Sequence, residues 1–114
     1  MCRKRIAVLV HGTWSPNSPW TLPGAKMYEL LREAGFTLNT YTWTGSNSFR
    51  ARNAASLDLA DELRDISENS PDADIVLIAH SHGGNVALNA IANSDVRIAG
   101  LVAMATPFSR AICR

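Results

Sequence analysis

The sequence Asp74-Ile75-Val76-Leu77-Ile78-Ala79-His80-Ser81-His82-Gly83-Gly84-Asn85-Val86-Ala87-Leu88 joins two apolar runs through an abrupt polar turn that carries a serine. The uncharged, aliphatic first run, residues 75–79, predicts a strand that is buried on both faces. The second run is apolar nearly all round, which predicts a buried helix. In so tight a turn the residues two before and two after Ser81, which are Ala79 and Gly83, must be small. The sequence therefore predicts a strand–turn–helix that holds the Ser81 hydroxyl out at the tip of a sheet.

The rest of the chain alternates strand and helix in the same way. The expected strands cover residues 5–10, 36–43, 75–79 and 98–105, and the expected helices cover 22–34, 51–68 and the segment after the serine turn. The face of the first helix consists of Met27, Leu30, Leu31 and Ala34, with Gly35 as its terminator. The second helix packs through Ala55, Leu59, Leu63 and Ile66. This order predicts an α/β fold: a parallel sheet of about four strands with three helices distributed over both faces.

Polar and aromatic residues follow each predicted strand. His11, Trp43, Ser81 and Thr106 all fall at carboxyl ends, where the ligands of open parallel sheets bind. The second strand is more polar than the others, so we expect it at an edge of the sheet. The sequence thus predicts a functional site around Ser81 at the carboxyl edge.

Two motifs carry a family resemblance. Residues 79–84 read Ala-His-Ser-His-Gly-Gly, which is the G-x-S-x-G pattern with alanine in the first position, and residues 8–14 read Val-Leu-Val-His-Gly-Thr-Trp. With these motifs the chain resembles the α/β-hydrolase family and its lipase- and esterase-like members. The resemblance implies a partial α/β-hydrolase fold with the spatial strand order 2-1-3-4. It also implies that residues 1–114 are a single domain that forms the N-terminal part of a longer hydrolase.

The resemblance also implies a site for hydrolysis of carboxylic esters, including lipid esters. Ser81 would be the nucleophile, and the backbone N–H groups of Thr13 and His82 would form the oxyanion hole, each contributing about 3 kcal/mol. His11, Gly12 and Gly83 would support the loop, although His11 could equally be a partly buried polar residue without a catalytic role. Trp14, Trp20 and Phe108 are expected to line an acyl pocket. For Trp43 we favour packing in the core.

The general base and its acid are not found in this sequence. The three histidines are His11, His80 and His82, and the last two flank the serine, whose turn directs them away from its hydroxyl. Asp72, Asp74 and Asp95 are predicted at the amino end of the sheet. Two hypotheses follow: the chain belongs to a longer serine hydrolase, or it is a non-catalytic α/β-hydrolase-like module. Labelling of Ser81 by a fluorophosphonate distinguishes them.

Composition excludes several other classes of function. A formal net charge of +1 gives no reason to expect a nucleic-acid partner. No segment is long enough to span a bilayer, and the apolar run at residues 6–10 is too short for a signal peptide, so we expect a cytoplasmic protein. Cys2 and Cys113 do not suggest a disulfide framework.

No metal or organic cofactor is expected. His80, His82 and His11 could supply imidazoles, but no carboxylate or thiolate is placed to complete a metal shell. The phosphate-binding pattern G-x-x-x-x-G-K-[ST] does not occur. The partner we expect is a small-molecule or lipid ester. Self-association through the last strand, which is apolar on both faces and would form an unprotected edge, can be checked by size-exclusion chromatography.

Overall fold

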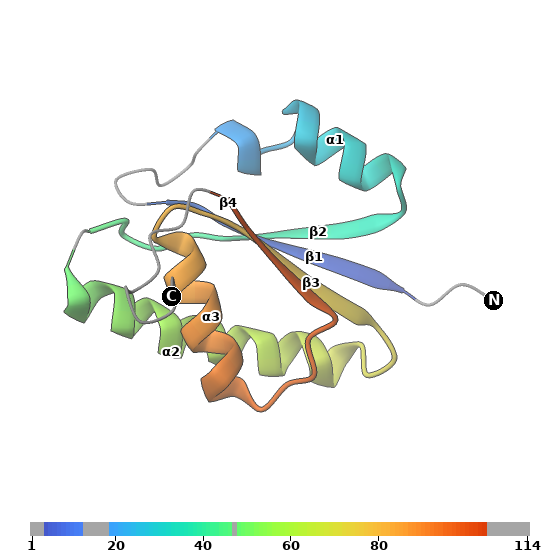
Figure 1. The fold of residues 1–114 in the computed structure, drawn as a ribbon. Helices are drawn as coiled ribbons and strands as arrows, with labels where there is room; N and C mark the ends of the chain where they lie inside the picture. The colour runs from blue at the N-terminus through green and yellow to red at the C-terminus, as the bar shows by residue number, and fades with distance from the viewer. Residues whose placement is uncertain (1–3, 13–18, 47, 105–114) are drawn as a thin grey trace, which may run out of the picture.

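A computed structural model describes residues 4–12, 19–46 and 48–104, which form one parallel sheet flanked by helices (Figure 1). The strands are β1 (Arg5–Val10), β2 (Phe36–Tyr41), β3 (Asp74–His80) and β4 (Gly100–Met104), and the helices are α1 (Lys26–Glu33), α2 (Phe49–Asn69) and α3 (Gly83–Ser94). The strands lie in the order β2-β1-β3-β4, and all three pairings are parallel. The predicted fold class, strand order and edge position of the second strand are confirmed.

The helices cover the two faces of the sheet unequally (Figure 1). Helix α1 lies on one face, and α2 and α3 lie together on the other. The larger core cluster lies between the sheet and the α2–α3 pair, and its fully buried side chains include Val8, Leu59, Leu63, Leu77 and Val86. A smaller cluster around Ala7, Leu9 and Ile78 lies beneath α1. Burial on both faces explains why β1 and β3 are continuous apolar runs.

Helix α1 differs from its prediction. It begins at Lys26 rather than Leu22, because Gly24 has a φ of +95°, a left-handed conformation that interrupts the helix after a short 3₁₀ turn at Pro19–Thr21. Met27 and Leu31 pack toward the sheet as expected, together with Tyr28. Leu30 is 56% exposed and Ala34 is also exposed, so the prediction that these two lie on the buried face was wrong. The helix ends as predicted, with Gly35 at a φ of +99°.

Helix α2 agrees closely with its prediction. Its N-cap Ser48 accepts a hydrogen bond from the Ala51 N–H over 3.0 Å, which satisfies one of the free donors of the first turn. Ala55, Leu59 and Leu63 are buried, and Ile66 packs against the same core cluster. The helix carries no acidic residue in its first turn and no basic residue in its last. Its stability therefore comes from the packed stripe rather than from charge placement.

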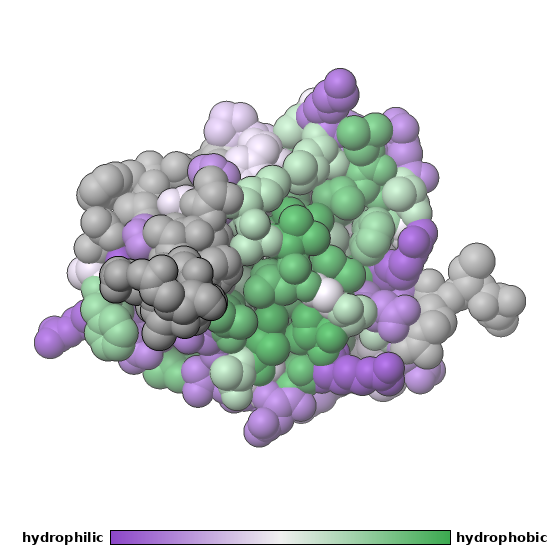
Figure 2. Space-filling view, in the orientation of Figure 1, coloured by the Kyte–Doolittle hydropathy of each residue, from purple (hydrophilic) through white to green (hydrophobic). Residues whose placement is uncertain are grey.

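Strand β4 lies at the second edge of the sheet and is partly uncovered. It pairs with β3 alone among the described strands, and Val102 is 52% exposed. Figure 2 shows a continuous apolar area on the face of the molecule that carries β4. No helix in the described part of the chain combines the length and apolar character that a membrane crossing requires.

Candidate active site

Ser81 lies in the turn between β3 and α3, with its backbone in the left-handed region at a φ of +56°. A side chain in this region costs about 1–2 kcal/mol, so the surrounding structure must hold it. Two backbone hydrogen bonds do so: the Ser81 N–H donates to the Met104 carbonyl of β4 over 2.8 Å, and the Ser81 carbonyl accepts from the Gly84 N–H over 3.0 Å. The strained turn is thus fixed to the sheet on one side and to the helix on the other.

The end of β1 packs directly against this turn. A Cβ atom built on Gly83 would lie 2.3 Å from the His11 carbonyl oxygen and 2.7 Å from that of Val10. A Cβ atom built on Gly12 would lie 2.8 Å from the Ser81 Cβ. Position 83 requires glycine because the atoms opposite it are backbone atoms, and a side chain at position 12 would displace the Ser81 Cβ or the neighbouring His80. Gly12 and the Ser81 side chain are therefore neighbours at the carboxyl edge of the sheet.

His82 forms the N-cap of α3, immediately after the serine. Among the described residues, none accepts a hydrogen bond from its backbone N–H. This N–H belongs to the positive end of the helix dipole, which favours negative charge. The imidazole Nδ1 of His82 accepts from the Asn85 side-chain amide over 3.1 Å. The backbone beside Ser81 can therefore donate to an oxyanion while the His82 ring is engaged by its own helix.

The pKa of His82 is lowered from its ordinary value of 6.5, first by burial and then by the positive charge of Arg52 on α2. A lowered folded-state pKa means that the unfolded chain binds more protons below pH 6.5, so the contribution of His82 to stability is full above this pH and is lost as the pH falls. We expect the free energy of unfolding to decrease between about pH 7.5 and about pH 5.5, and His82→Gln to reduce this decrease. Urea unfolding at each pH measures both chains; identical pH profiles would contradict the prediction.

His11 is fully buried and links β1 to the segment after β2. Its Nδ1 lies 2.8 Å from the Gly12 carbonyl oxygen, and its Nε2 lies 2.9 Å from both the backbone nitrogen and the carbonyl oxygen of Trp43. With the proton on Nδ1, the ring donates to the Gly12 carbonyl and accepts from the Trp43 N–H. The Trp43 indole N–H donates to the His11 carbonyl over 3.0 Å, and the two rings stack with centroids 5.4 Å apart. Trp43 is itself buried in the core, as the sequence favoured. Both ring nitrogens of His11 are engaged by backbone groups.

The remaining predicted site residues are only partly described. Thr13, Trp14 and Phe108 lie outside the described residues, as do Thr106, Cys2 and Cys113. Trp20 is half-buried, with its ring edge-on to that of His80 at a centroid distance of 6.5 Å. This contact places Trp20 beside the residue that precedes Ser81. Its role in an acyl pocket stays a prediction.

The described residues do not assemble a base and an acid around Ser81. Asp74 begins β3, and Asp72 precedes it, at the amino end of the strand, while Asp95 follows the far end of α3. No three His, Cys, Asp or Glu side chains in the described ranges lie close enough to hold a metal ion. Ser81 therefore lies beside backbone N–H donors, and the described residues provide no base to accept its proton.

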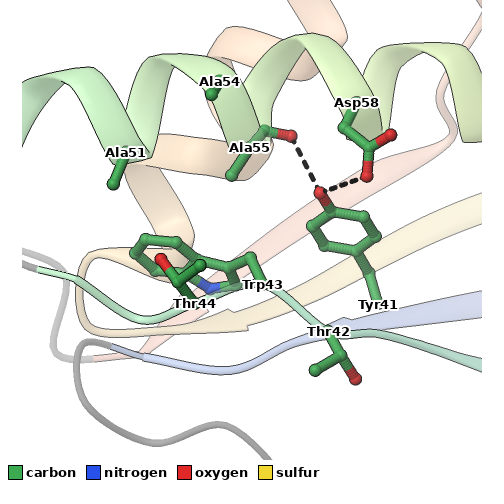
Figure 3. A pocket seen from close by; sticks show the side chains of 8 residues that line it. All are labelled: Tyr41, Thr42, Trp43, Thr44, Ala51, Ala54, Ala55 and Asp58. Atoms are coloured by element: carbon green, nitrogen blue, oxygen red, sulfur yellow. Dashed lines mark hydrogen bonds between the residues drawn. The ribbon is translucent and has the colours of Figure 1, made fainter.

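Sequence reasoning missed a cavity of about 290 Å³ between the end of β2 and the first half of α2 (Figure 3). Its lining residues are Tyr41, Thr42, Trp43, Thr44, Ala51, Ala54, Ala55 and Asp58. The available signal was the pair Ala51 and Ala54, small residues on a helix face near a strand end rich in aromatic side chains. That signal has no meaning until the two segments are known to be adjacent.

Comparison with solved structures shows where this fold recurs. The chain is similar to a lipase of Bacillus licheniformis, BlEst2 in its mature form, with a TM-score of 0.76 and 21% identity over 94% of this chain and 42% of that one. It is similar to an uncharacterized protein from Bacillus cereus, with a TM-score of 0.72 and 16% identity over 93% of this chain and 35% of that one. An acetyl xylan esterase aligns with a TM-score of 0.65 and 14% identity, covering 97% of this chain and 67% of that one.

The first two structures are much longer than this chain, which spans well under half of each. At these identities the likeness concerns the fold alone. No curated protein matches the sequence significantly. The sequence does match the profile of the Alpha/beta hydrolase family over residues 7–112, nearly its whole length. Together with the parallel sheet, the left-handed serine turn and the glycine contacts beneath it, this match shows that the chain belongs to the alpha/beta hydrolase family.

Proposed function

We propose that Ser81 is the nucleophile of a serine hydrolase that acts on carboxylic esters. The observation that carries this proposal is the left-handed Ser81 backbone at the β3–α3 turn, whose Cβ lies against Gly12 at the end of β1. A strained residue persists only where its surroundings hold it, and such residues cluster at active sites. The family membership and the lipase and esterase among the structural neighbours support an ester as the substrate.

The oxyanion formed by attack on the ester carbonyl would be stabilised by backbone donors. The His82 N–H at the start of α3 is one, and the Thr13 N–H, in the loop after β1, is proposed as the second. Each donor aimed at the developing charge contributes about 3 kcal/mol to catalysis. Because His11 and Gly12 directly follow β1, His11 would fix the start of this loop through its bonds to Gly12 and Trp43. An apolar acyl group would lie near Trp20, Trp14 and Phe108.

Proton transfer from the Ser81 hydroxyl requires a base that the described residues do not supply. The proposed activity therefore belongs to a protein in which a histidine and an acid reach Ser81 from outside residues 4–104. The competing function is a module that keeps the hydrolase core for folding or protein contact. The partly exposed apolar strand β4 would be its contact surface, through which two copies could associate; size-exclusion chromatography would detect that dimer.

A fluorophosphonate probe tests the nucleophile. In a protein that supplies the histidine and the acid, we expect covalent labelling of Ser81, located by peptide mass spectrometry, and complete loss of labelling in Ser81→Ala. The matched control is Ser70→Ala, at the far end of α2, which should label like the parent. Both variants should retain the circular dichroism spectrum of the parent. Absence of labelling in the folded parent would overturn the hydrolase function for this chain and favour the module.

A further inference from the structure

The cavity beside Trp43 is separate from the Ser81 turn and has two chemically different ends (Figure 3). Tyr41 and Asp58 mark one end, and Trp43, Thr44 and Ala51 mark the other. Between them α2 presents the small side chains of Ala54 and Ala55, so the helix leaves the space unfilled. A cavity with apolar and aromatic walls and a few convergent polar groups is the usual form of a small-molecule site.

The polar end is acidic. The Asp58 Oδ2 accepts a hydrogen bond from the Tyr41 hydroxyl over 2.8 Å, and the same hydroxyl lies 3.2 Å from the Ala55 carbonyl oxygen. This orients the carboxylate and leaves its Oδ1 without a donor among the described side chains. The described ion pairs, Glu29–Arg32 and Asp61–Arg64, do not involve Asp58. A fixed carboxylate at the mouth of an apolar cavity favours a ligand with a positive charge.

The negative charge of Asp58 contributes to the raised pKa values of two neighbouring groups. Burial, followed by the hydrogen bond and charge of Asp58, holds the pKa of Tyr41 well above its ordinary value. Burial, followed by the charges of Asp58 and Asp65, raises the pKa of Glu62 one turn further along α2. Burial is the larger cause of both shifts, and the negative charge of Asp58 adds to each in the same direction.

We infer that this cavity binds a small primary ammonium ion with an aromatic or short alkyl body. The ammonium would donate to the Asp58 Oδ1, and the apolar body would lie along Ala54 and Ala51 toward the Trp43 indole. Because one face of that indole is covered by His11, the ligand meets its remaining surface. A primary ammonium is preferred over a quaternary one because the carboxylate oxygen requires an N–H donor.

The test uses benzylammonium as the probe and benzyl alcohol as its neutral control. Titration of the ¹⁵N-labelled chain, followed at the Trp43 indole N–H resonance, should give saturable binding of benzylammonium and at least about tenfold weaker binding of benzyl alcohol. Equal affinity for the two compounds would overturn the ammonium assignment. A Trp43 resonance that does not respond to either compound would overturn the site.

Three variants locate the ligand. Asp58→Asn keeps an oxygen that can accept from Tyr41 but removes the charge, and it should weaken benzylammonium binding at least about tenfold. Ala54→Leu fills the cavity without changing the charge and should also abolish binding. Asp65→Asn removes an equivalent exposed charge from α2 outside the cavity and should bind like the parent. If Asp58→Asn retains the parent affinity, or if Asp65→Asn loses as much as Asp58→Asn, the proposed site is wrong.

Discussion

Gly83→Ala should be the most destabilising single methyl addition in the described chain. The new Cβ would lie 2.3 Å from the His11 carbonyl oxygen and 2.7 Å from that of Val10. Both contacts are with the backbone of a buried central strand, so no rotamer change can relieve them, and either β1 or the turn must shift. We expect the free energy of unfolding to fall by about 3 kcal/mol or more, measured by urea unfolding followed by circular dichroism.

Gly100→Ala is the matched control for this prediction. A Cβ on Gly100 would meet nothing within 4 Å, although this glycine also lies in a strand of the same sheet. Alanine there should be neutral or should stabilise the protein by about 0.4–1 kcal/mol, because it restricts the unfolded chain. Opposite signs for the two variants would show that contact with β1 decides the Gly83 result. A Gly83→Ala protein as stable as the parent would contradict the packing described for the serine turn.

His11→Ala should be the second large effect, because His11 contributes both packing and hydrogen bonding in a fully buried position. The substitution leaves the Trp43 N–H and the Gly12 carbonyl without their partner and opens a cavity beside the Trp43 ring. Each unsatisfied buried group costs about 1–3 kcal/mol, so we expect a total loss of about 3 kcal/mol or more in the free energy of unfolding.

His11→Phe separates the two contributions. Phenylalanine keeps an aromatic ring of similar shape against Trp43 but cannot form either hydrogen bond, so the two unsatisfied groups should still cost about 2 kcal/mol or more. His80→Ala serves as the control, since His80 is exposed at the end of β3, and it should change stability by less than about 1 kcal/mol. If His11→Phe is as stable as the parent, the hydrogen bonds to Gly12 and Trp43 contribute nothing and only the volume of the ring matters.

The serine turn could be predicted from sequence because its determinants are local. A buried strand, small residues two positions before and after Ser81 and an apolar helix, all within fifteen residues, specify one conformation. The alternation of strands with helices along the chain specifies the parallel sheet. The start of α1 differs from its prediction because Pro23 and Gly24, a turn signal present in the sequence, interrupt the helix that the apolar spacing indicates. The exposure of Leu30 depends on the rotation of α1 about its own axis relative to the sheet, which the local sequence pattern does not determine.

Other parts of the site depend on contacts between distant segments. The lowered pKa of His82 follows from its burial and from the charge of Arg52, thirty positions earlier on another helix. The stack of His11 on Trp43 requires β1 and β2 to end at the same height, which the sequence implied only as a shared edge. The cavity at Asp58 arises because three alanines on α2 happen to face the end of β2. Such features follow from the tertiary arrangement and could not be read residue by residue.

The hydrogen bond from the Ser81 amide to the Met104 carbonyl makes the serine turn depend on the outermost strand of the described sheet. Edge strands fray before central ones, and each such opening would release the amide that holds Ser81 in its unfavourable conformation. The persistence of that conformation is thus limited by how long β4 stays paired with β3, rather than by the stability of the buried strand β3 itself. Amide hydrogen exchange at Ser81 should therefore follow the rate at β4, and any chain that covers this edge would slow both together.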